Sequence, residues 1–312
     1  MQDRRSFYVV FAIAAVLVVP AAIALRTVVH PAILQAKSDN PTPLGYTWSL
    51  LLFIVPIAAL GWWFACRPDL QFPRKAFWRT IAVLTPVGFL LDLLFGNAFF
   101  IFRNKAATLG CEIPAVGGAI PIEEFVFYLA GFMLVLLSYI WCDEYWMAAY
   151  NVPDYTAAAK GIARIVRFHF ASVALGVALI AAAVLYRKFV SGAAEGFPWY
   201  FIYLVCASII PSAGFFHTAR SFINWRAFSF TFFLLLLISL LWEVTLALPY
   251  GWWEYQPRAL MGLHIGAWSG LPIEAVCVWL AVTFTTVITY EVIKIWKALG
   301  TRALEAFFGI RK

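Results

Sequence analysis

The chain has 312 residues, of which 63% are hydrophobic and only 12% are charged. So much apolar surface exceeds what a soluble core can bury, which excludes a water-soluble globular protein and indicates an integral membrane protein. The net charge of +7 is compatible with nucleic-acid binding, but the cationic side chains are spread over loops between apolar segments, so no nucleic-acid partner is expected.

Eight apolar segments in the chain are long enough to cross a bilayer as helices, which takes about 20 residues each. In chain order they are 7–29, 47–66, 78–101, 120–141, 163–187, 198–216, 227–249 and 271–293. Pro56 lies inside the second segment, where a kink is tolerable in a membrane helix. We therefore predict an all-α polytopic membrane protein with about eight transmembrane helices.

The cationic residues favour one orientation in the membrane. With eight helices, 16 of the 23 Lys and Arg residues fall on the side of the chain ends and 7 fall on the other side. The positive-inside rule then places both termini in the cytoplasm. We expect the membrane to be a cell membrane of bacterial type. Arg4 and Arg5 precede an apolar run longer than a signal-peptide core, so we expect this run to remain as a helix. Residues 298–312 form a basic and apolar tail, expected on the cytoplasmic surface.

Internal similarity at an offset of 151 residues divides the chain into two units. The matched positions are Asp92 with Glu243, Pro121-Ile122-Glu123 with Pro272-Ile273-Glu274, and Tyr139 with Tyr290. Two acids and a Pro-Ile-Glu triplet in one register are hard to explain by chance. We predict a first four-helix repeat at 1–150 and a second at 151–297, with the same orientation in the membrane and related by an axis along its normal.

The repeated motif places carboxyl groups at the start of a membrane-length helix. Pro121 suits the first helical position, and Glu123 and Glu124 follow in the first turn. One interpretation is structural, because acidic side chains are stabilised at the positive end of a helix dipole. The other is acid catalysis, because a carboxylic acid in an apolar pocket beside a second carboxylate can hold a proton near neutral pH and donate it. The repetition favours catalysis by Glu123 or Glu124.

Two further acids precede the motifs. Asp92 and Glu243 lie inside apolar runs, and an acid within a membrane helix indicates function unless it is a structural partner of a nearby hydroxyl or Arg. Glu274 is the counterpart of Glu123, whereas Ala275 replaces the second carboxylate. We expect the additional acids to tune the donor, relay its proton or take it back. The candidate catalytic residues are Glu123, Glu124, Asp92, Glu243 and Glu274.

The chain is rich in aromatic residues, with 14 Trp, 13 Tyr and 29 Phe. The aromatic belts of a membrane protein explain most of them. Rings can also shelter a carbocation through the cation–π attraction. The candidates for substrate binding and cation stabilisation are Trp242, Trp252, Trp253, Phe127, Tyr139 and Tyr290.

Motifs for cofactors and metals are absent from the sequence. It has no GxGxxG motif after a strand, no P-loop, no HExxH motif and no DDxxD motif. Its five Cys residues are scattered and include no CxxC pair. We therefore predict no cofactor and no metal.

The paired motifs resemble those of the heterodimer-type lycopene cyclases, small integral membrane carotenoid cyclases that also occur as two repeats fused in one chain. The family pattern is P-[IL]-E-E after a glycine-containing loop, with an acid after an aromatic residue on the preceding helix. Pro121-Ile122-Glu123-Glu124 matches it in full, and Leu271-Pro272-Ile273-Glu274 matches it in part, after Trp242-Glu243. The chain departs from the pattern at Ala275, and at Glu243, where aspartate is expected.

This resemblance implies a cofactor-independent, redox-neutral cyclisation of a linear polyene such as lycopene within the membrane. A carboxylic acid protonates the terminal double bond, the next double bond attacks the tertiary cation, and loss of a proton leaves a six-membered end ring. The implied partners are a hydrophobic polyene or isoprenoid from the bilayer and membrane lipids, and a homo-oligomer is left open. The alternatives are another polyisoprenoid cyclase, hydratase or isomerase, or a membrane lipid carrier without enzymatic activity, since parallel repeats also occur in carriers.

Overall fold

The computed structural model describes residues 43–310 except 68, 71, 193, 194 and 269, together with residues 18 and 22. The predicted first span, 7–29, therefore lies outside the described residues except at 18 and 22. The structure is 70% helical with almost no sheet. Within the described residues, seven helical segments are long and apolar enough to cross a membrane. The chain is thus an all-α polytopic membrane protein, as predicted.

The spanning helices correspond to seven of the eight predicted segments. They are α2 with α3 (Gly45–Ser49 and Leu51–Ala65), α4 (Arg74–Phe99), α5 (Ile122–Trp141), α7 (Phe170–Phe189), α8 (Trp199–Ala219), α9 (Trp225–Trp242) and α10 (Glu274–Leu299). A π-helical turn extends α5 over Cys142–Trp146, and another extends α9 over Glu243–Ala247. Two short helices, α6 (Tyr155–Ala159) and α11 (Ala303–Phe308), lie outside the spans.

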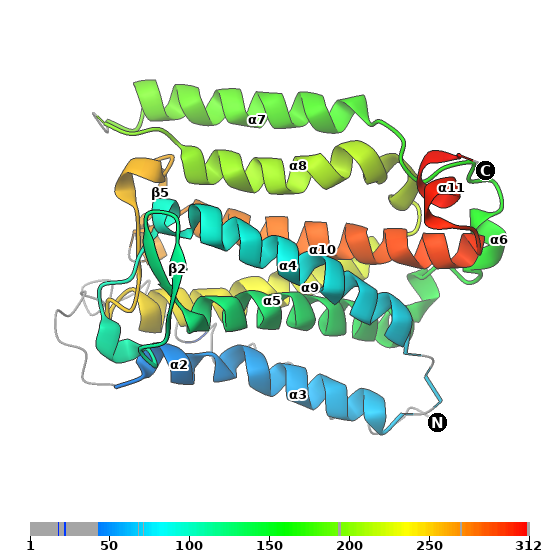
Figure 1. The fold of residues 1–312 in the computed structure, drawn as a ribbon, viewed down its shortest axis with the longest axis horizontal. Coiled ribbons are helices and arrows are strands. Elements are labelled where there is room, and N and C mark those ends of the chain that lie inside the picture. Colours follow the sequence, from blue (N-terminus) through cyan, green and yellow to red (C-terminus); the bar gives the residue numbers. More distant parts are fainter. Residues whose placement is uncertain are drawn as a thin grey trace.

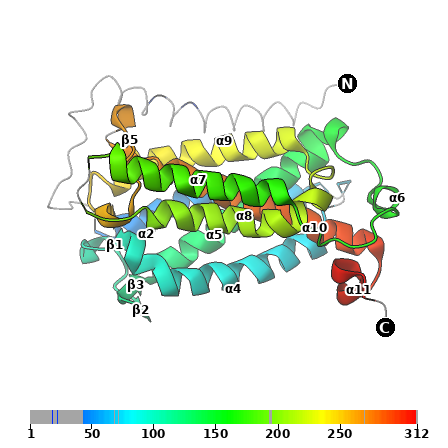
Figure 2. The ribbon, with the colours of Figure 1, turned by 90° about the horizontal axis from the view of Figure 1, so that it is seen from above.

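The long helices lie side by side along the longest axis of the molecule, with α6 and α11 at one end and the short strands at the other (Figure 1). Seen from above, α4 and α9 lie on opposite sides of the bundle (Figure 2). In its most apolar stretch the segment 122–146 is 72% buried, against 22% in 45–65, 170–189 and 199–219. Helix α5 is therefore central, and α3, α7 and α8 expose apolar surface, as expected of helices that face lipid.

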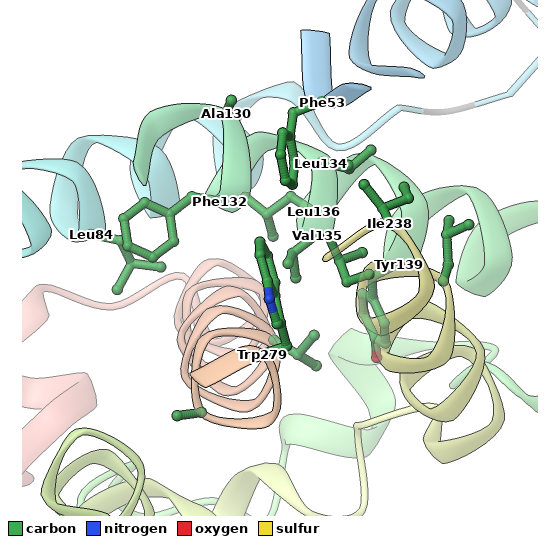
Figure 3. Close-up of a cluster of buried hydrophobic side chains, with 14 of the residues drawn as sticks. Phe53, Leu84, Ala130, Phe132, Leu134, Val135, Leu136, Tyr139, Ile238 and Trp279 are labelled. Carbon is green, nitrogen blue, oxygen red and sulfur yellow. The ribbon is translucent and has the colours of Figure 1, made fainter. Parts of the chain in front are cut away.

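The hydrophobic core packs around α5. Its side chains meet Phe53 of α3, Ile238 of α9 and Trp279 of α10 (Figure 3). The rings of Phe53 and Trp279 stack with their centroids 5.8 Å apart. The core therefore joins helices of the first predicted unit to helices of the second, and both units contribute to one buried interior.

Among the described residues, three two-stranded antiparallel pairings connect the helices at one end of the bundle. They are β2 (Glu112–Ala115) with β3 (Gly118–Pro121), β5 (His264–Ile265) with β6 (Leu271–Pro272), and β1 (Phe100–Ile101) with β4 (Glu254–Tyr255). The prolines of the two motifs end β3 and β6. Strand pairing thus fixes the points at which α5 and α10 begin.

Helices α8 and α10 are joined where a proline interrupts the hydrogen bonds of α8. Pro211 has no N–H to donate to the carbonyl of Ala207, four residues earlier. The hydroxyl of Thr285 on α10 donates to that carbonyl instead, at 2.9 Å. A hydrogen bond that α8 cannot make within itself therefore fastens it to its neighbour.

The predicted span 163–187 begins too early, because α7 starts at Phe170. The preceding residues bond to other elements: the N–H of Ile165 donates to α11 and the N–H of Arg167 donates to α8, each at 2.8 Å. The side chain of His169 accepts a hydrogen bond from the first turn of α7 and so caps it. These partners come from distant parts of the chain, so apolar length alone placed the boundary wrongly.

The predicted tail, 298–312, begins inside α10. That helix continues to Leu299 and ends where Gly300 adopts a left-handed conformation with φ 65°, which glycine adopts without strain. The tail then forms α11, whose Ala306 is buried and accepts the hydrogen bond from the N–H of Ile165. The tail is thus packed on the segment that leads into α7.

Side chains at matched positions of the two predicted units meet in the bundle. The rings of Tyr139 and Tyr290 have centroids 6.0 Å apart, and Lys294 Nζ lies 3.4 Å from Asp143 Oδ2. Each pair is separated by 151 residues (290 − 139 and 294 − 143). The segments of the two predicted units that carry these residues therefore pack against each other.

Candidate functional site

The candidate acids gather at the end of the bundle that carries the short strands. Helices α4 and α9 end at the same end of the bundle at which α5 and α10 begin. The acids near the ends of α4 and α9 therefore lie at the same level as the acids in the first turns of α5 and α10. All are buried, with exposed fractions of 2% for Asp92, 1% for Glu123, 6% for Glu124, 2% for Glu243 and 0% for Glu274. The structure therefore brings the predicted acids to one end of the molecule.

Among the described residues, none of these acids makes a direct ion pair, although Arg187 and His264 are close enough to Glu274 to interact with it electrostatically. Across the described ranges, no Lys or Arg side chain lies within 4.0 Å of any of the five. At the opposite end, by contrast, Lys294 Nζ lies within 4.0 Å of Asp143, Glu144 and Glu291. A buried carboxylate without a counter-charge is costly, so such a group is stable either as the neutral acid or with several hydrogen-bond donors.

Glu124 faces a small cavity between α5, α9 and α10. The hydroxyl of Tyr46, a buried residue of α2, donates to Glu124 Oε1. Asp92 is close enough to interact electrostatically with Glu124, and Tyr128 lies beside Asp92. One oxygen of Glu124 is therefore held by a neutral donor, and the second oxygen remains for other chemistry.

Glu123 and Glu274 hold the segments that precede their helices. Glu123 Oε1 accepts hydrogen bonds from the N–H of Leu109 at 2.7 Å and from the hydroxyl of Thr47 at 2.6 Å. Glu274 Oε1 accepts one from the N–H of Met261 at 2.5 Å. Neither acid lines the cavity. The structural interpretation of the motif fits the contacts of these two acids, whereas Glu124 lines the cavity.

Glu243 faces the same cavity from the second unit. It begins the π-helical turn that extends α9, a type of distortion that is frequent at functional sites. The hydroxyl of Ser239 donates to Oε1 at 2.7 Å, and that of Tyr255 donates to Oε2 at 2.6 Å. Burial raises the pKa of Tyr255 well above its usual value and the charge of Glu243 adds to this, so the tyrosine remains a donor.

The cavity has a volume of about 50 Å³ and is lined from both predicted units. Five of the predicted site residues contribute to its lining: Glu124, Glu243, Phe127, Trp242 and Trp253. Most of the remaining lining is aromatic and includes Tyr128, Tyr200, Tyr255 and Trp279. The site is therefore an apolar, aromatic pocket with two carboxyl groups.

The rings form a continuous surface around the cavity. Phe127 and Trp242 stack with centroids 4.8 Å apart, and Trp242 lies 5.6 Å from Trp253. Trp279 meets Phe127 edge to face at 5.7 Å. The indole N–H of Trp242 donates to Ser49 Oγ at 2.7 Å, which fixes that ring. Because ring faces carry negative potential, this surface suits an apolar group that becomes positively charged.

Three predicted aromatic residues lie away from the cavity. Trp252 packs against Gly45 of α2, where an added Cβ would come within 2.5 Å of the indole. Tyr139 lies 15 residues beyond Glu124 on α5 (139 − 124), which is about 22 Å along the helix. Tyr290 lies beside Tyr139. These positions do not fit the expectation that the three rings shelter a cation at this cavity.

Residues of the site that sequence analysis missed include Tyr46, Tyr128, Tyr255 and Trp279. Tyr128 and Trp279 are separated by the repeat offset of 151 residues (279 − 128), so an aromatic residue at the same position of both units was an available signal. Tyr46 and Tyr255 reach their acids from segments outside the predicted spans. Only the folded chain brings them there.

The described part of the chain contains no group of three or more His, Cys, Asp or Glu side chains arranged to hold a metal ion.

Comparisons of the chain with protein-family models, curated proteins and solved structures found no match. The class of protein therefore follows from the fold and the site: a polytopic α-helical membrane protein with a buried pocket of acids and aromatic rings at one end.

Proposed function

We propose that the protein is a carotenoid cyclase of the lycopene type, which closes an end ring on a linear polyene by acid catalysis within the membrane. The observation that carries the proposal is the cavity in which Glu124 and Glu243 face aromatic rings, without a Lys or Arg partner in the described ranges. The resemblance of the Pro121-Ile122-Glu123-Glu124 motif to these cyclases agrees with it.

Glu124 is the proton donor in this proposal. Tyr46 occupies its Oε1, which leaves Oε2 to carry the proton. Transfer of that proton to the terminal carbon–carbon double bond of the polyene forms a tertiary carbocation. The Tyr46 hydroxyl then stabilises the carboxylate that remains. The electron pair of the next double bond forms the carbon–carbon bond that closes the ring, and the positive charge moves to a ring carbon.

Glu243 is the base. It accepts two hydroxyl hydrogen bonds, whereas Glu124 accepts one from Tyr46, so the surroundings of Glu243 stabilise the ionised form better. Removal of a proton from the carbon beside the cation forms the ring double bond and leaves Glu243 neutral. The proton then returns across the cavity to Glu124. One proton is given and one is taken, so substrate and product are isomers and no oxidant is needed.

The size of the cavity favours cyclisation over hydration. At about 50 Å³ it is far below the roughly 300 Å³ of an ordinary small-molecule site. An end group of the substrate enters only if the aromatic rings move, and it then fills the space. A filled apolar pocket excludes the water that would otherwise trap the cation as an alcohol.

The test is pigment analysis in a bacterial host that accumulates lycopene. The wild-type chain should convert lycopene to a product of the same mass with one or two end rings. Glu124→Gln and Glu243→Gln should each reduce this product by roughly 10²–10⁴-fold, the usual contribution of a general acid or base. Glu112→Gln, the same change at an exposed position of β2, is the matched control and should leave the product unchanged.

Glu123→Gln separates the two neighbouring acids. Glutamine retains a side-chain oxygen that can accept the hydrogen bonds from Leu109 and Thr47, so this variant should still form the ring. Full activity of Glu124→Gln, with loss in Glu123→Gln, would contradict the assignment. A product heavier by one water would indicate a hydratase, and unchanged lycopene with well-expressed protein would favour another polyisoprenoid substrate or a carrier.

A further inference from the structure

Two larger hollows lie away from the acidic cavity. The first is an apolar groove of about 580 Å³ formed by α7, α8, α9 and α10. Its walls include Leu175 and Leu179 of α7, Ile209 of α8, and Leu280 and Phe284 of α10. The second is a cavity of about 510 Å³ beside α6 and the end of α8.

The second hollow is basic. Its lining includes Arg164, Arg167 and His217, together with the hydroxyl groups of Thr218 and Ser221, and it contains no acidic residue. In the ranges that the structure describes, neither arginine takes part in an ion pair. The hydroxyl of Thr218 already donates to the carbonyl of Ile165, so the two cationic side chains and the hydroxyl of Ser221 are the groups that suit a phosphate.

The two hollows adjoin one another. His169 lines the groove and His217 lines the basic cavity, and their rings have centroids 6.4 Å apart. Phe216, the residue before His217, lines the groove and packs on His169 at 5.1 Å. A ligand with a charged head and an apolar chain could therefore occupy both hollows at once.

The dimensions and surroundings fit a membrane lipid. The groove follows α8 from residue 201 to residue 216. At 1.5 Å per residue its length is about 22 Å, which exceeds the ~15 Å thickness of the hydrocarbon in one leaflet. Phe168 and Phe170 follow Arg167 in the chain, and 69% and 73% of their surfaces are exposed. Exposed aromatic rings next to arginines are typical of the boundary between headgroups and acyl chains.

We propose that these two hollows bind an anionic phospholipid, with its phosphate at Arg164 and Arg167 and an acyl chain in the groove. This inference does not depend on the cyclase proposal, because none of its residues lines the acidic cavity. The lipid would bridge α7, α8 and α10 on the outside of the bundle.

Native mass spectrometry of the full chain in detergent tests the proposal, with phosphatidylglycerol and phosphatidylcholine of identical acyl chains as probes. The wild type should retain phosphatidylglycerol in preference to phosphatidylcholine. A cation near an anionic lipid contributes about fivefold in affinity, so Arg164→Gln/Arg167→Gln should weaken phosphatidylglycerol binding about 30-fold. Arg220→Gln/Arg302→Gln removes the same charge near the same end, outside both linings, and should not weaken it.

A second variant tests the groove. Leu175→Trp narrows the groove without changing its charge, and it should reduce the retention of phosphatidylglycerol. Equal retention of the two lipids by the wild type would overturn the proposal, as would equal losses in the two double-arginine variants. Displacement of the lipid by inorganic phosphate alone would show an anion site without a chain site. If Arg164→Gln/Arg167→Gln fails to fold, the lipid preference of the wild type and the Leu175→Trp result decide the question.

Discussion

A substitution that fills the acidic cavity at Gly131 separates the proposed role of the cavity in substrate binding from its effect on stability. Gly131 lies on α5 and lines the cavity, and no atom lies within 4 Å of an added Cβ. Alanine therefore fits without displacing a neighbour. Leucine adds three further carbons, each roughly the size of a water molecule, which needs ~10–15 Å³ of free cavity volume. These carbons would occupy the cavity of about 50 Å³.

The expected effects on stability and on activity have opposite signs. Replacing glycine within a helix stabilises it by up to ~1 kcal/mol, and each carbon that leucine buries adds about 0.8 kcal/mol. Gly131→Leu should therefore unfold at the same temperature as the wild type or a higher one. In the proposed mechanism the same carbons stand where the end group of the polyene enters, and each ~1.4 kcal/mol of hindrance reduces the rate about tenfold.

The assay compares ring formation with thermal unfolding for Gly131→Ala, Gly131→Leu and a control. Gly61→Leu is the control, because Gly61 is also helical with open space around it but lies on α3, outside the cavity. Product should fall in the order wild type, Gly131→Ala, Gly131→Leu, and it should be unchanged in the control. A stable Gly131→Leu protein with full activity would refute the reasoning. It would show that the end group of the substrate reacts somewhere other than in the cavity that leucine fills.

Three further changes test the contacts that support the site and the bundle. Lys294→Met should lower the free energy of unfolding by roughly 3–5 kcal/mol, because it leaves buried carboxylates without their shared cation. Lys297→Met, at an exposed position, is its control, and equal melting temperatures would contradict the ion-pair account. Thr285→Val should cost about 1 kcal/mol in denaturant unfolding, because it frees the carbonyl that the proline of α8 leaves unpaired. Thr289→Val should cost less, since that hydroxyl bonds within its own helix. Tyr46→Phe should slow ring formation, because the carboxylate left after proton transfer loses its donor, and an unchanged rate would exclude that role.

The positions of the helices could be predicted because apolar length is a local property of the chain. Seven of the eight predicted spans are helical, and the first lies outside the described residues. The start of α7 was misplaced by seven residues (170 − 163). The residues before Phe170 bond to α8 and α11, and no local pattern records partners so distant in the chain.

The sequence by itself determined that acids would meet aromatic residues in a membrane bundle. Its repeat and its motif identified Glu123 and Glu124, and both are buried at one end of the molecule. The choice between them needed the tertiary structure, because neighbouring residues of a helix point about 100° apart. Packing turns Glu124 toward the cavity and Tyr46, and it turns Glu123 toward the N–H of Leu109. Motif and composition indicate which groups are present, but the direction of each side chain is decided by the helices packed around it.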